Sequence, residues 1–271
     1  MKEAPRLRRS IVHERLAKSL PVYCFKSNIP HPMMPELLAL GGVHCLWLDC
    51  EHFAATSETL SAQVQAARGA DVDAVVRVPN GEYALAARML DNGANGIMYP
   101  QVRDPEDVAR LVDRTRFAPL GRRGADFGPA AALYGQVPWE DVRRYQNEQV
   151  KVLIQIETPE AVERIDEIAA VPGISLLFIG PGDLSITMGL PMDAAAPHVL
   201  DAMRRTAEAA QHHGLHWGMP VLDRSHAVRI LSMGGRFLTQ GGDTSVLLKA
   251  VQQLRAEIAE VSEPYGGLDP G

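Results

Sequence analysis

The sequence has few of the features that mark disulfide-rich, secreted or membrane proteins. Of its 271 residues only 3 are cysteine, and Cys24, Cys45 and Cys50 form no CxxC pair. Neither a disulfide framework nor a structural zinc site is expected, and we interpret these cysteines as small buried apolar residues. No apolar run approaches the roughly 20 residues that a transmembrane helix needs, and no apolar segment follows the N-terminal charges as in a signal peptide. We expect a cytoplasmic protein.

The chain also lacks a strong excess of either charge. It has 27 Lys and Arg against 33 Asp and Glu, a formal net charge of -6. This balance argues against nucleic acid or an anionic membrane as the main partner. The basic cluster RLRR at residues 6–9 falls in an expected flexible N-terminal arm, residues 1–15.

What the chain does have is enough apolar sequence for a large core. Hydrophobic residues make up 46% of it, and no composition break or low-complexity tract marks a second domain. We predict one domain over residues 16–260, followed by a C-terminal tail over residues 261–271.

Short β-rich runs alternate with helical patterns along this domain, which is typical of parallel βαβ units. The predicted strands are residues 21–25, 43–49, 73–78, 96–100, 150–157, 175–180, 215–221 and 236–241. Eight such units predict a (β/α)8 barrel, although a doubly wound open sheet gives nearly the same pattern. The long gap at residues 101–150 contains a helix and a segment rich in glycine and arginine, which we expect to cross the barrel mouth.

Charged side chains follow several of these strands directly. They are Asp49, Glu51 and His52 after the second strand, Arg77 in the third, Glu157 after the fifth and Asp183 beyond the sixth. Active sites of α/β barrels lie at the C-terminal ends of the strands. Each residue alone could cap a loop or form a salt bridge, but the convergence of the set indicates a functional site.

The residue types indicate the chemistry of this site. Glu157 and Asp183 are hard oxygen ligands that suit Mg²⁺ or Mn²⁺. The turn with Gly180 and Gly182 could offer backbone N–H groups to a carboxylate or phosphate. Arg77 is suited to an oxyanion, and His52 can move a proton near neutral pH. Together these groups favour formation of an enolate next to a carboxylate.

Several longer segments are similar to one known family. They are LDCEHF, VVRVP, LDNGANGIMYPQV, PLGRRG, IQIETPEAVERIDEIAAVPGI and FIGPGDLSITMGLP. Over residues 16–249 the chain resembles the HpcH/HpaI aldolases, the class II pyruvate aldolases that include 4-hydroxy-2-oxoheptane-1,7-dioate aldolase and 2-keto-3-deoxy-sugar-acid aldolases.

The resemblance implies a role for each matching position. It implies that Glu157 and Asp183 bind the metal, with Asp49 and Glu51 close enough to hold waters on it. Arg77 would bind the 2-oxo oxygen and stabilise the enolate.

Other matching positions concern the substrate and the proton. The resemblance implies that His52 transfers the proton, oriented by Asp91, and that Arg123 lies near the substrate entrance, supplied across a subunit boundary. It also implies substrate contacts from Gln155, Gly180, Pro181, Gly182 and Asp183.

The activity implied is reversible cleavage of a 4-hydroxy-2-oxo acid to pyruvate, or a close 2-oxo acid, and an aldehyde, with Mg²⁺, Mn²⁺ or Co²⁺. The assembly implied is a homo-hexamer, a trimer of dimers, that exchanges a C-terminal helix over residues 245–261. Two alternatives remain: an acyl-CoA lyase of the citryl- or malyl-CoA type, which needs a basic surface for the CoA phosphates, and a non-catalytic oxo-acid-binding relative. Cys50, Phe53, Phe25 and Lys26 depart from the common family pattern and bear on which aldehyde fits.

Overall fold

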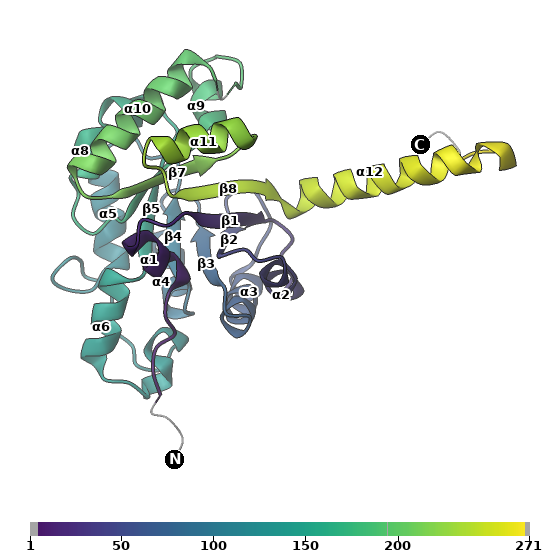
Figure 1. Ribbon diagram of the computed structural model, residues 1–271. Helices are drawn as coiled ribbons and strands as arrows, with labels where there is room; N and C mark the ends of the chain where they lie inside the picture. The colour runs from purple at the N-terminus through teal and green to yellow at the C-terminus, as the bar shows by residue number, and fades with distance from the viewer. Residues whose placement is uncertain (1–4, 194, 269–271) are drawn as a thin grey trace.

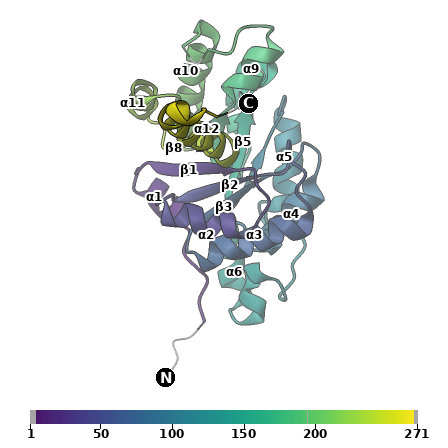
Figure 2. The ribbon, with the colours of Figure 1, turned by 90° about the vertical axis from the view of Figure 1, so that its right-hand side faces the viewer.

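The computed structural model describes residues 5–193 and 195–268, and its strands form a closed barrel. The strands lie in chain order, and β8 pairs with β1 in parallel. Helices surround the barrel on the outside (Figures 1 and 2). The predicted (β/α)8 barrel is confirmed, and the closure between first and last strand excludes the open sheet.

Each of the eight predicted runs forms a strand. The strands are β1 (Val22–Ser27), β2 (Cys45–Asp49), β3 (Asp73–Arg77), β4 (Gly96–Tyr99), β5 (Lys151–Ile156), β6 (Leu176–Ile179), β7 (His216–Pro220) and β8 (Phe237–Gly242). Most of their residues are buried on both faces, as expected for a parallel sheet covered by helices.

The helices lie mainly between consecutive strands. They are α1 (Ile11–Ala17), α2 (Met33–Leu40), α3 (Ser57–Gly69), α4 (Tyr83–Asp91), α5 (Pro105–Thr115), the 3-10 helix η1 (Ala130–Gly135), α6 (Trp139–Glu148), α7 (Pro159–Glu163), α8 (Ile165–Ala169), α9 (Pro181–Thr187), α10 (Pro197–His212), α11 (Arg224–Ser232), α12 (Asp243–Ser262) and η2 (Glu263–Tyr265). Side-chain N-caps from Thr56, Asp104 and Thr158 begin helices shortly after strand ends, which keeps the loops there short.

The core has two parts because alternate strand residues face opposite sides of the barrel wall. Leu46 and Leu48 of β2 belong to the layer between strands and helices, whereas Trp47 belongs to the barrel interior. Inside the barrel, the Phe178 ring lies edge-on to Trp47 at 5.6 Å and to Phe237 at 6.0 Å between ring centroids. These three rings form an apolar floor below the C-terminal ends of the strands.

Helix α1 closes the other end of the barrel. Its Val12 and Leu16 join the interior cluster. The buried carboxylate of Asp73, at the start of β3, accepts hydrogen bonds from Ser10 Oγ at 2.7 Å and Val12 N at 2.8 Å, and it pairs with Arg8. The part of the expected flexible arm from Arg8 onward therefore makes specific contacts with the barrel; residues 1–4 lie outside the described part of the chain.

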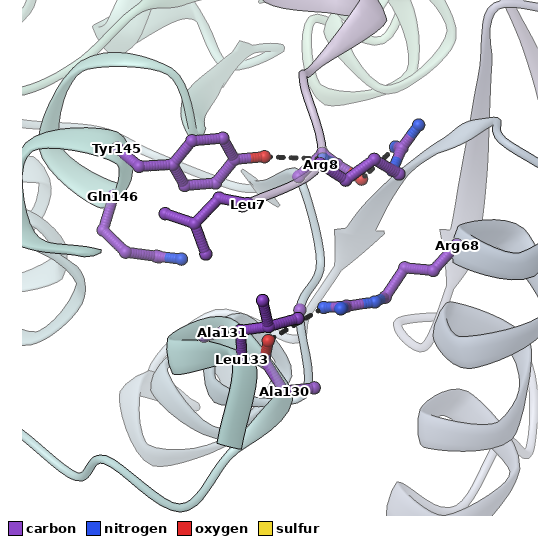
Figure 3. A pocket seen from close by; sticks show the side chains of 10 residues that line it. Leu7, Arg8, Arg68, Ala130, Ala131, Leu133, Tyr145 and Gln146 are labelled. Atoms are coloured by element: carbon purple, nitrogen blue, oxygen red, sulfur yellow. Dashed lines mark hydrogen bonds between the residues drawn. The ribbon is translucent and has the colours of Figure 1, made fainter. Parts of the chain in front are cut away.

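The glycine- and arginine-rich segment does not cross the barrel mouth, so that prediction was wrong. It connects the end of α5 to α6 and lies at the amino ends of the strands, where η1 packs beside the N-terminal arm (Figure 3). There, Arg68 at the end of α3 donates to the carbonyl of Ala130 at 3.1 Å. The physical reason is topological: outer helices run antiparallel to the strands, so any segment between a helix and the next strand lies at the amino end.

Helix α12 leaves the barrel and projects away from it (Figure 1). Asp243 holds its first turn, because this buried carboxylate accepts hydrogen bonds from the backbone N–H groups of Asn28 and Ile29 at the end of β1. Along the helix a stripe of apolar side chains is more than half exposed: Leu247, Val251, Leu254 and Ile258. Within the described residues, no helix has the length and hydropathy to cross a membrane.

Lys151, the first residue of β5, is a buried cation at the amino end of the barrel. Its Nζ lies 3.0 Å from Nδ1 of His13 and donates to the carbonyl of Glu148 at 3.2 Å. Burial, followed by the charge of Arg116, lowers the pKa of Lys151 from its ordinary 10.5 to about 8. The charged lysine therefore opposes folding at neutral pH.

We expect the free energy of unfolding to rise between about pH 8 and pH 10.5, because over this interval the folded state binds fewer protons than the unfolded chain. The contribution of Lys151 should be on the order of 2–3 kcal/mol. Denaturant unfolding of the wild type and of Lys151→Met, at about pH 7 and about pH 10, measures it. The same pH dependence in both proteins would contradict this prediction.

Candidate active site

The sequence-predicted charged residues do meet at the C-terminal ends of the strands. Asp49 and Arg77 end neighbouring strands and are Cα partners in the sheet. Gln155 belongs to β5, and Glu157 comes directly after the last residue of that strand. Because alternate residues face inward, these side chains lie in the layers above the aromatic floor.

Arg77 is the centre of this arrangement and is only 3% exposed. Its Nε donates to Asp49 Oδ1 at 2.9 Å and its Nη2 to Asp49 Oδ2 at 2.6 Å, a bidentate pair. Its Nη1 lies 2.7 Å from Glu51 Oε2 and donates to Gln155 Oε1 at 3.4 Å. Asp49 thus fixes one edge of the guanidinium, and Nη1 on the other edge faces Glu51 and Gln155.

Asp49 is charged and fully engaged. Burial raises the pKa of its carboxyl, but hydrogen bonds and charges from Arg77 and then Lys26 together outweigh burial and bring the pKa to about 2. Its oxygens also accept the backbone N–H of Glu51 at 3.0 Å. Asp49 therefore serves first to hold Arg77, and its predicted contact with waters on a metal remains a prediction.

Glu157 is a completely buried carboxylate beside this pair. Its Oε1 accepts from the backbone N–H of Gln101 at 2.7 Å, and its Oε2 accepts from Gln155 Nε2 at 2.9 Å. Burial raises the Glu157 pKa to about 7, opposed by the Gln101 hydrogen bond and reinforced by the charges of Asp183 and Glu51. A carboxylate in this environment favours a positive partner.

The turn after β6 is shaped by Glu157. A Cβ on Gly180 would lie 2.3 Å from Glu157 Oε2, so only glycine allows this carboxylate its position. Helix α9 begins at Pro181 and places Gly182 and the partly exposed Asp183 in its first turn. First-turn N–H groups have no acceptor within a helix, so this turn can receive an anionic group of a substrate.

The histidine after β2 lies at the rim of the site. The His52 side chain is 56% exposed, and its Nε2 is 3.5 Å from Glu51 Oε2. Glu51 is thus a carboxylate neighbour of His52, and the imidazole remains accessible to a substrate.

Asp91 and Arg123 do not join the site within one chain. Asp91 ends α4, at the amino end of the barrel, and its Oδ1 accepts from Arg123 Nη2 at 2.6 Å. Arg123 is 7% exposed and also donates to Gln146 of α6. Within one chain, Asp91 and Arg123 thus lie at the opposite end of the barrel from His52; the orienting role of Asp91 and the supply of Arg123 across a subunit boundary remain predictions.

Sequence reasoning missed the role of one further residue, Lys26 of β1. Its Nζ lies 2.8 Å from Asp49 Oδ2 and 4.9 Å from the centroid of the Trp47 ring. In the sequence, Lys26 stands out only as a departure from the common family pattern. Its inward position at a strand end, two residues after Cys24 in the interior cluster, is the signal that could have identified it.

The carboxylates of this site fit a hard divalent cation. Glu51, Glu157 and Asp183 act on one another as like charges, and burial raises the pKa of Glu51. Glu51 Oε2 is buried without a hydrogen bond of good geometry, despite its ion-pair distance to Arg77. A cation would relieve this repulsion, and an all-oxygen donor set is typical of Mg²⁺ and Mn²⁺.

A separate group of potential ligands lies on the outer helices. His212 Nδ1 and His213 Nε2 contact the same oxygen of Asp166, at 3.1 and 2.9 Å. Imidazole ligands favour zinc, copper or nickel over magnesium. This cluster contains none of the residues that the sequence analysis singled out.

Comparisons with known proteins agree on one family. The model of the HpcH/HpaI aldolase/citrate lyase family matches residues 25–250. A 5-keto-4-deoxy-D-glucarate aldolase from Enterobacter sp. (strain 638) is 34% identical over 238 residues, which are 88% of this chain and 92% of that protein.

Solved structures give the same result. An HpcH/HpaI aldolase from Desulfitobacterium hafniense DCB-2 has a TM-score of 0.84 at 28% identity, covering 91% of this chain and 96% of that one. An HpcH/HpaI aldolase/citrate lyase family protein from Burkholderia cenocepacia J2315 has a TM-score of 0.82 at 33% identity, covering 92% and 99%.

We expect Glu157→Gln to lower the affinity for Mn²⁺ by more than about 100-fold, since losing even an outer partner of a metal ligand costs roughly 10- to 100-fold. Gly180→Ala should also weaken binding, because the added methyl displaces Glu157 Oε2. Electron paramagnetic resonance of free Mn²⁺ measures both. Asp166→Ala is the matched control and should bind Mn²⁺ as the wild type does. Wild-type affinity in Glu157→Gln would remove this residue from the metal site.

Proposed function

The chain belongs to the HpcH/HpaI aldolase/citrate lyase family and is an aldolase, a carbon–carbon lyase, and we propose that it reversibly cleaves 4-hydroxy-2-oxo acids to pyruvate, or a close 2-oxo acid, and an aldehyde. The observation that carries this proposal is the fixed guanidinium of Arg77 between the Asp49 carboxylate and the buried pair Gln155 and Glu157. Such a site has a rigid positive donor where an enolate oxygen would form.

The family is in general dependent on a divalent metal ion. In this chain Glu157 and Asp183 would hold it, and we propose Mg²⁺, Mn²⁺ or Co²⁺. The cation would polarise the 2-oxo group and offset negative charge on the enolate.

Arg77 supplies the second stabilising charge. Its Nη1 edge donates to the 2-oxo oxygen, and because Asp49 already holds the opposite edge, little reorganisation is needed as charge develops. Gln155 and the backbone N–H groups of Gly182 and Asp183 orient the substrate carboxylate. Gly180 and Pro181 shape the turn that presents these N–H groups.

His52 acts as the base. It takes the proton of the C4 hydroxyl, and C4 becomes the aldehyde carbon as the C3–C4 bond breaks. The electron pair of that bond passes to C3 and the 2-oxo group, which form the enolate. The contact with Glu51 supports a role for that carboxylate in orienting the imidazole; the same role for Asp91 remains a prediction.

An acyl-CoA substrate is disfavoured by the placement of the arginines. Arg122 pairs with Asp113 at 2.7 Å and Arg123 with Asp91, both at the amino end of the barrel. These adjacent arginines are candidates for binding CoA phosphates, and within one chain they lie at the opposite end of the barrel from Glu157. A non-catalytic role is disfavoured because Asp49, Arg77, Gln155 and Glu157 lie in one hydrogen-bond network.

His52→Ala tests the reaction. We expect aldol cleavage to fall roughly 100- to 10,000-fold, the usual contribution of a general base. Decarboxylation of oxaloacetate should fall much less, because it needs the metal and Arg77 but no proton from a C4 hydroxyl. In the wild type, chelation should abolish both reactions, and Mg²⁺, Mn²⁺ or Co²⁺ should restore them.

Two results would contradict the proposed mechanism. Equal losses of both reactions in His52→Ala would show that this histidine is not the base. Full cleavage activity in the chelated wild type would overturn the metal-dependent mechanism.

We also propose that the protein is a homo-oligomer, a hexamer built as a trimer of dimers, in which α12 packs on a neighbouring copy. The exposed stripe Leu247, Val251, Leu254 and Ile258 supports this, because its spacing places four apolar side chains on one helix face. A cytoplasmic location remains a prediction.

Leu254→Glu should shift the sedimentation coefficient of the protein toward that of a smaller species, since a charge would enter the packed stripe. Gln252→Glu, on an exposed polar position of the same helix, is the control and should sediment like the wild type. A wild type that sediments as a monomer would contradict the proposal, as would an unchanged Leu254→Glu oligomer.

A further inference from the structure

Three potential metal ligands lie together outside the active site. His212 is the last residue of α10, His213 is its C-cap, and Asp166 belongs to α8; we call these three residues the histidine cluster. Helix α10 runs antiparallel to the strands, so its C-terminal end lies at the amino end of the barrel, next to α8 (Figure 1). The length of the strands therefore separates the histidine cluster from Glu157.

The ligand atoms of the histidine cluster converge. Nδ1 of His212 lies 3.1 Å and Nε2 of His213 lies 2.9 Å from the same oxygen, Oδ1 of Asp166. One nitrogen or oxygen from each of the three residues lies within 4.8 Å of those from the other two. Ligand atoms about 2.0–2.2 Å from a tetrahedral zinc ion are about 3.4 Å from one another. Small rotations of these side chains would therefore admit an ion between them.

The end of α10 brings two consecutive histidines to one side. Consecutive residues within an α-helix point about 100° apart and do not face each other. The chain leaves the helix at His213, which has φ -97° and ψ 7°, and Gly214 follows with a φ of 66°. The two imidazole ring centroids lie 4.5 Å apart as a result, with both rings directed at Asp166.

The charge and exposure of the histidine cluster suit a cation from solvent. Two neutral imidazoles and one carboxylate carry one negative charge. The cluster also lies at the C-terminal end of a 16-residue helix, where the helix dipole attracts positive charge. The His213 side chain is only 20% exposed, whereas those of His212 and Asp166 are 71% and 67% exposed. One ligand is thus held in place by packing, and the other two leave the ion a path to solvent.

We propose that Asp166, His212 and His213 form a second metal site, which binds Zn²⁺ through one carboxylate oxygen and two imidazole nitrogens. A water molecule completes the four ligands that zinc prefers. The ion connects α8 to α10, the helices that precede and follow β6. Imidazole donors suit Zn²⁺, Ni²⁺ and Cu²⁺, and Mn²⁺ stands at the weak end of this affinity order. The site therefore differs in preferred ion from the carboxylates proposed to bind the active-site metal.

Zinc titration against a chromophoric chelator tests the proposal, with the active site kept occupied by excess Mg²⁺. The wild type should bind Zn²⁺ at the histidine cluster, and His213→Ala and Asp166→Asn should each weaken this binding by more than about 100-fold, because each removes a direct ligand. Aldol cleavage with Mg²⁺ should be unchanged in both variants, since neither residue lies in the active site. This activity also shows that the variants are folded.

Two control variants keep the histidine cluster intact. Gln211→Ala changes the exposed neighbouring position of α10, and His31→Ala removes an exposed histidine elsewhere on the chain. Both should bind Zn²⁺ as the wild type does. Electron paramagnetic resonance of Cu²⁺ identifies the ligands, because nitrogen donors give hyperfine structure that oxygen donors do not. This structure should be present in the wild type and both controls and should be lost in a double variant, His212→Ala with His213→Ala.

Thermal unfolding gives an independent measurement. With Zn²⁺ at about 100 times its dissociation constant and Mg²⁺ in excess, the midpoint should rise by about 5–10 °C more in the wild type than in His213→Ala.

Three results would overturn the inference. Zn²⁺ affinity in His213→Ala and Asp166→Asn equal to that of the wild type would leave these side chains as a surface ion pair. An equal loss of affinity in His31→Ala would show that zinc binds exposed histidines in general. Nitrogen hyperfine structure that persists in the double variant would place the copper ligands elsewhere.

Discussion

The bidentate pair between Asp49 and Arg77 is the interaction on which the rest of the site depends. It joins the ends of β2 and β3, and hydrogen bonds continue from Arg77 through Gln155 to Glu157, and from Glu157 to the backbone of Gln101. The buried charges of Asp49 and Arg77 offset each other, as the cost of desolvation requires. Removing one partner would leave the others uncompensated, so this network fixes its donors before any substrate arrives.

The two ends of the barrel differ in structure: the amino ends of the parallel strands are packed, and their carboxyl ends hold the polar site. The amino end is closed by α1, by the contacts of Asp73 and by Arg116, which donates to the carbonyls of Gly173, Gln146 and Val150. The carboxyl end is open and polar above the floor of Trp47, Phe178 and Phe237. A well-packed amino end and floor allow the strand ends above them to hold charged groups in fixed positions.

The family and the geometry of the site together favour an aldolase reaction over an acyl-CoA lyase reaction. The family includes aldolases and citrate lyases, and the arginines that might have served a CoA ester lie at the wrong end of the barrel. At the open end, Lys26 and Phe53 line the side opposite Glu157. The proposed metal-binding side and the side of Lys26 thus face each other across the mouth, with the exposed His52 at the rim.

The sequence by itself determined the eight alternating strands and the charged residues at the ends of β2, β3, β5 and β6, because hydrophobic periodicity and strand-end position are local properties. Closure of the sheet into a barrel was decided by the tertiary structure. The tertiary structure alone decided which charged groups meet. Asp91 and Arg123 are close to family-like motifs in sequence but pair with each other at the amino end. Lys26 has no motif, yet the pairing of β1 with β2 brings it to Asp49. Pairing of side chains depends on strand register and on the direction of each helix, which are set by the packing of the whole chain.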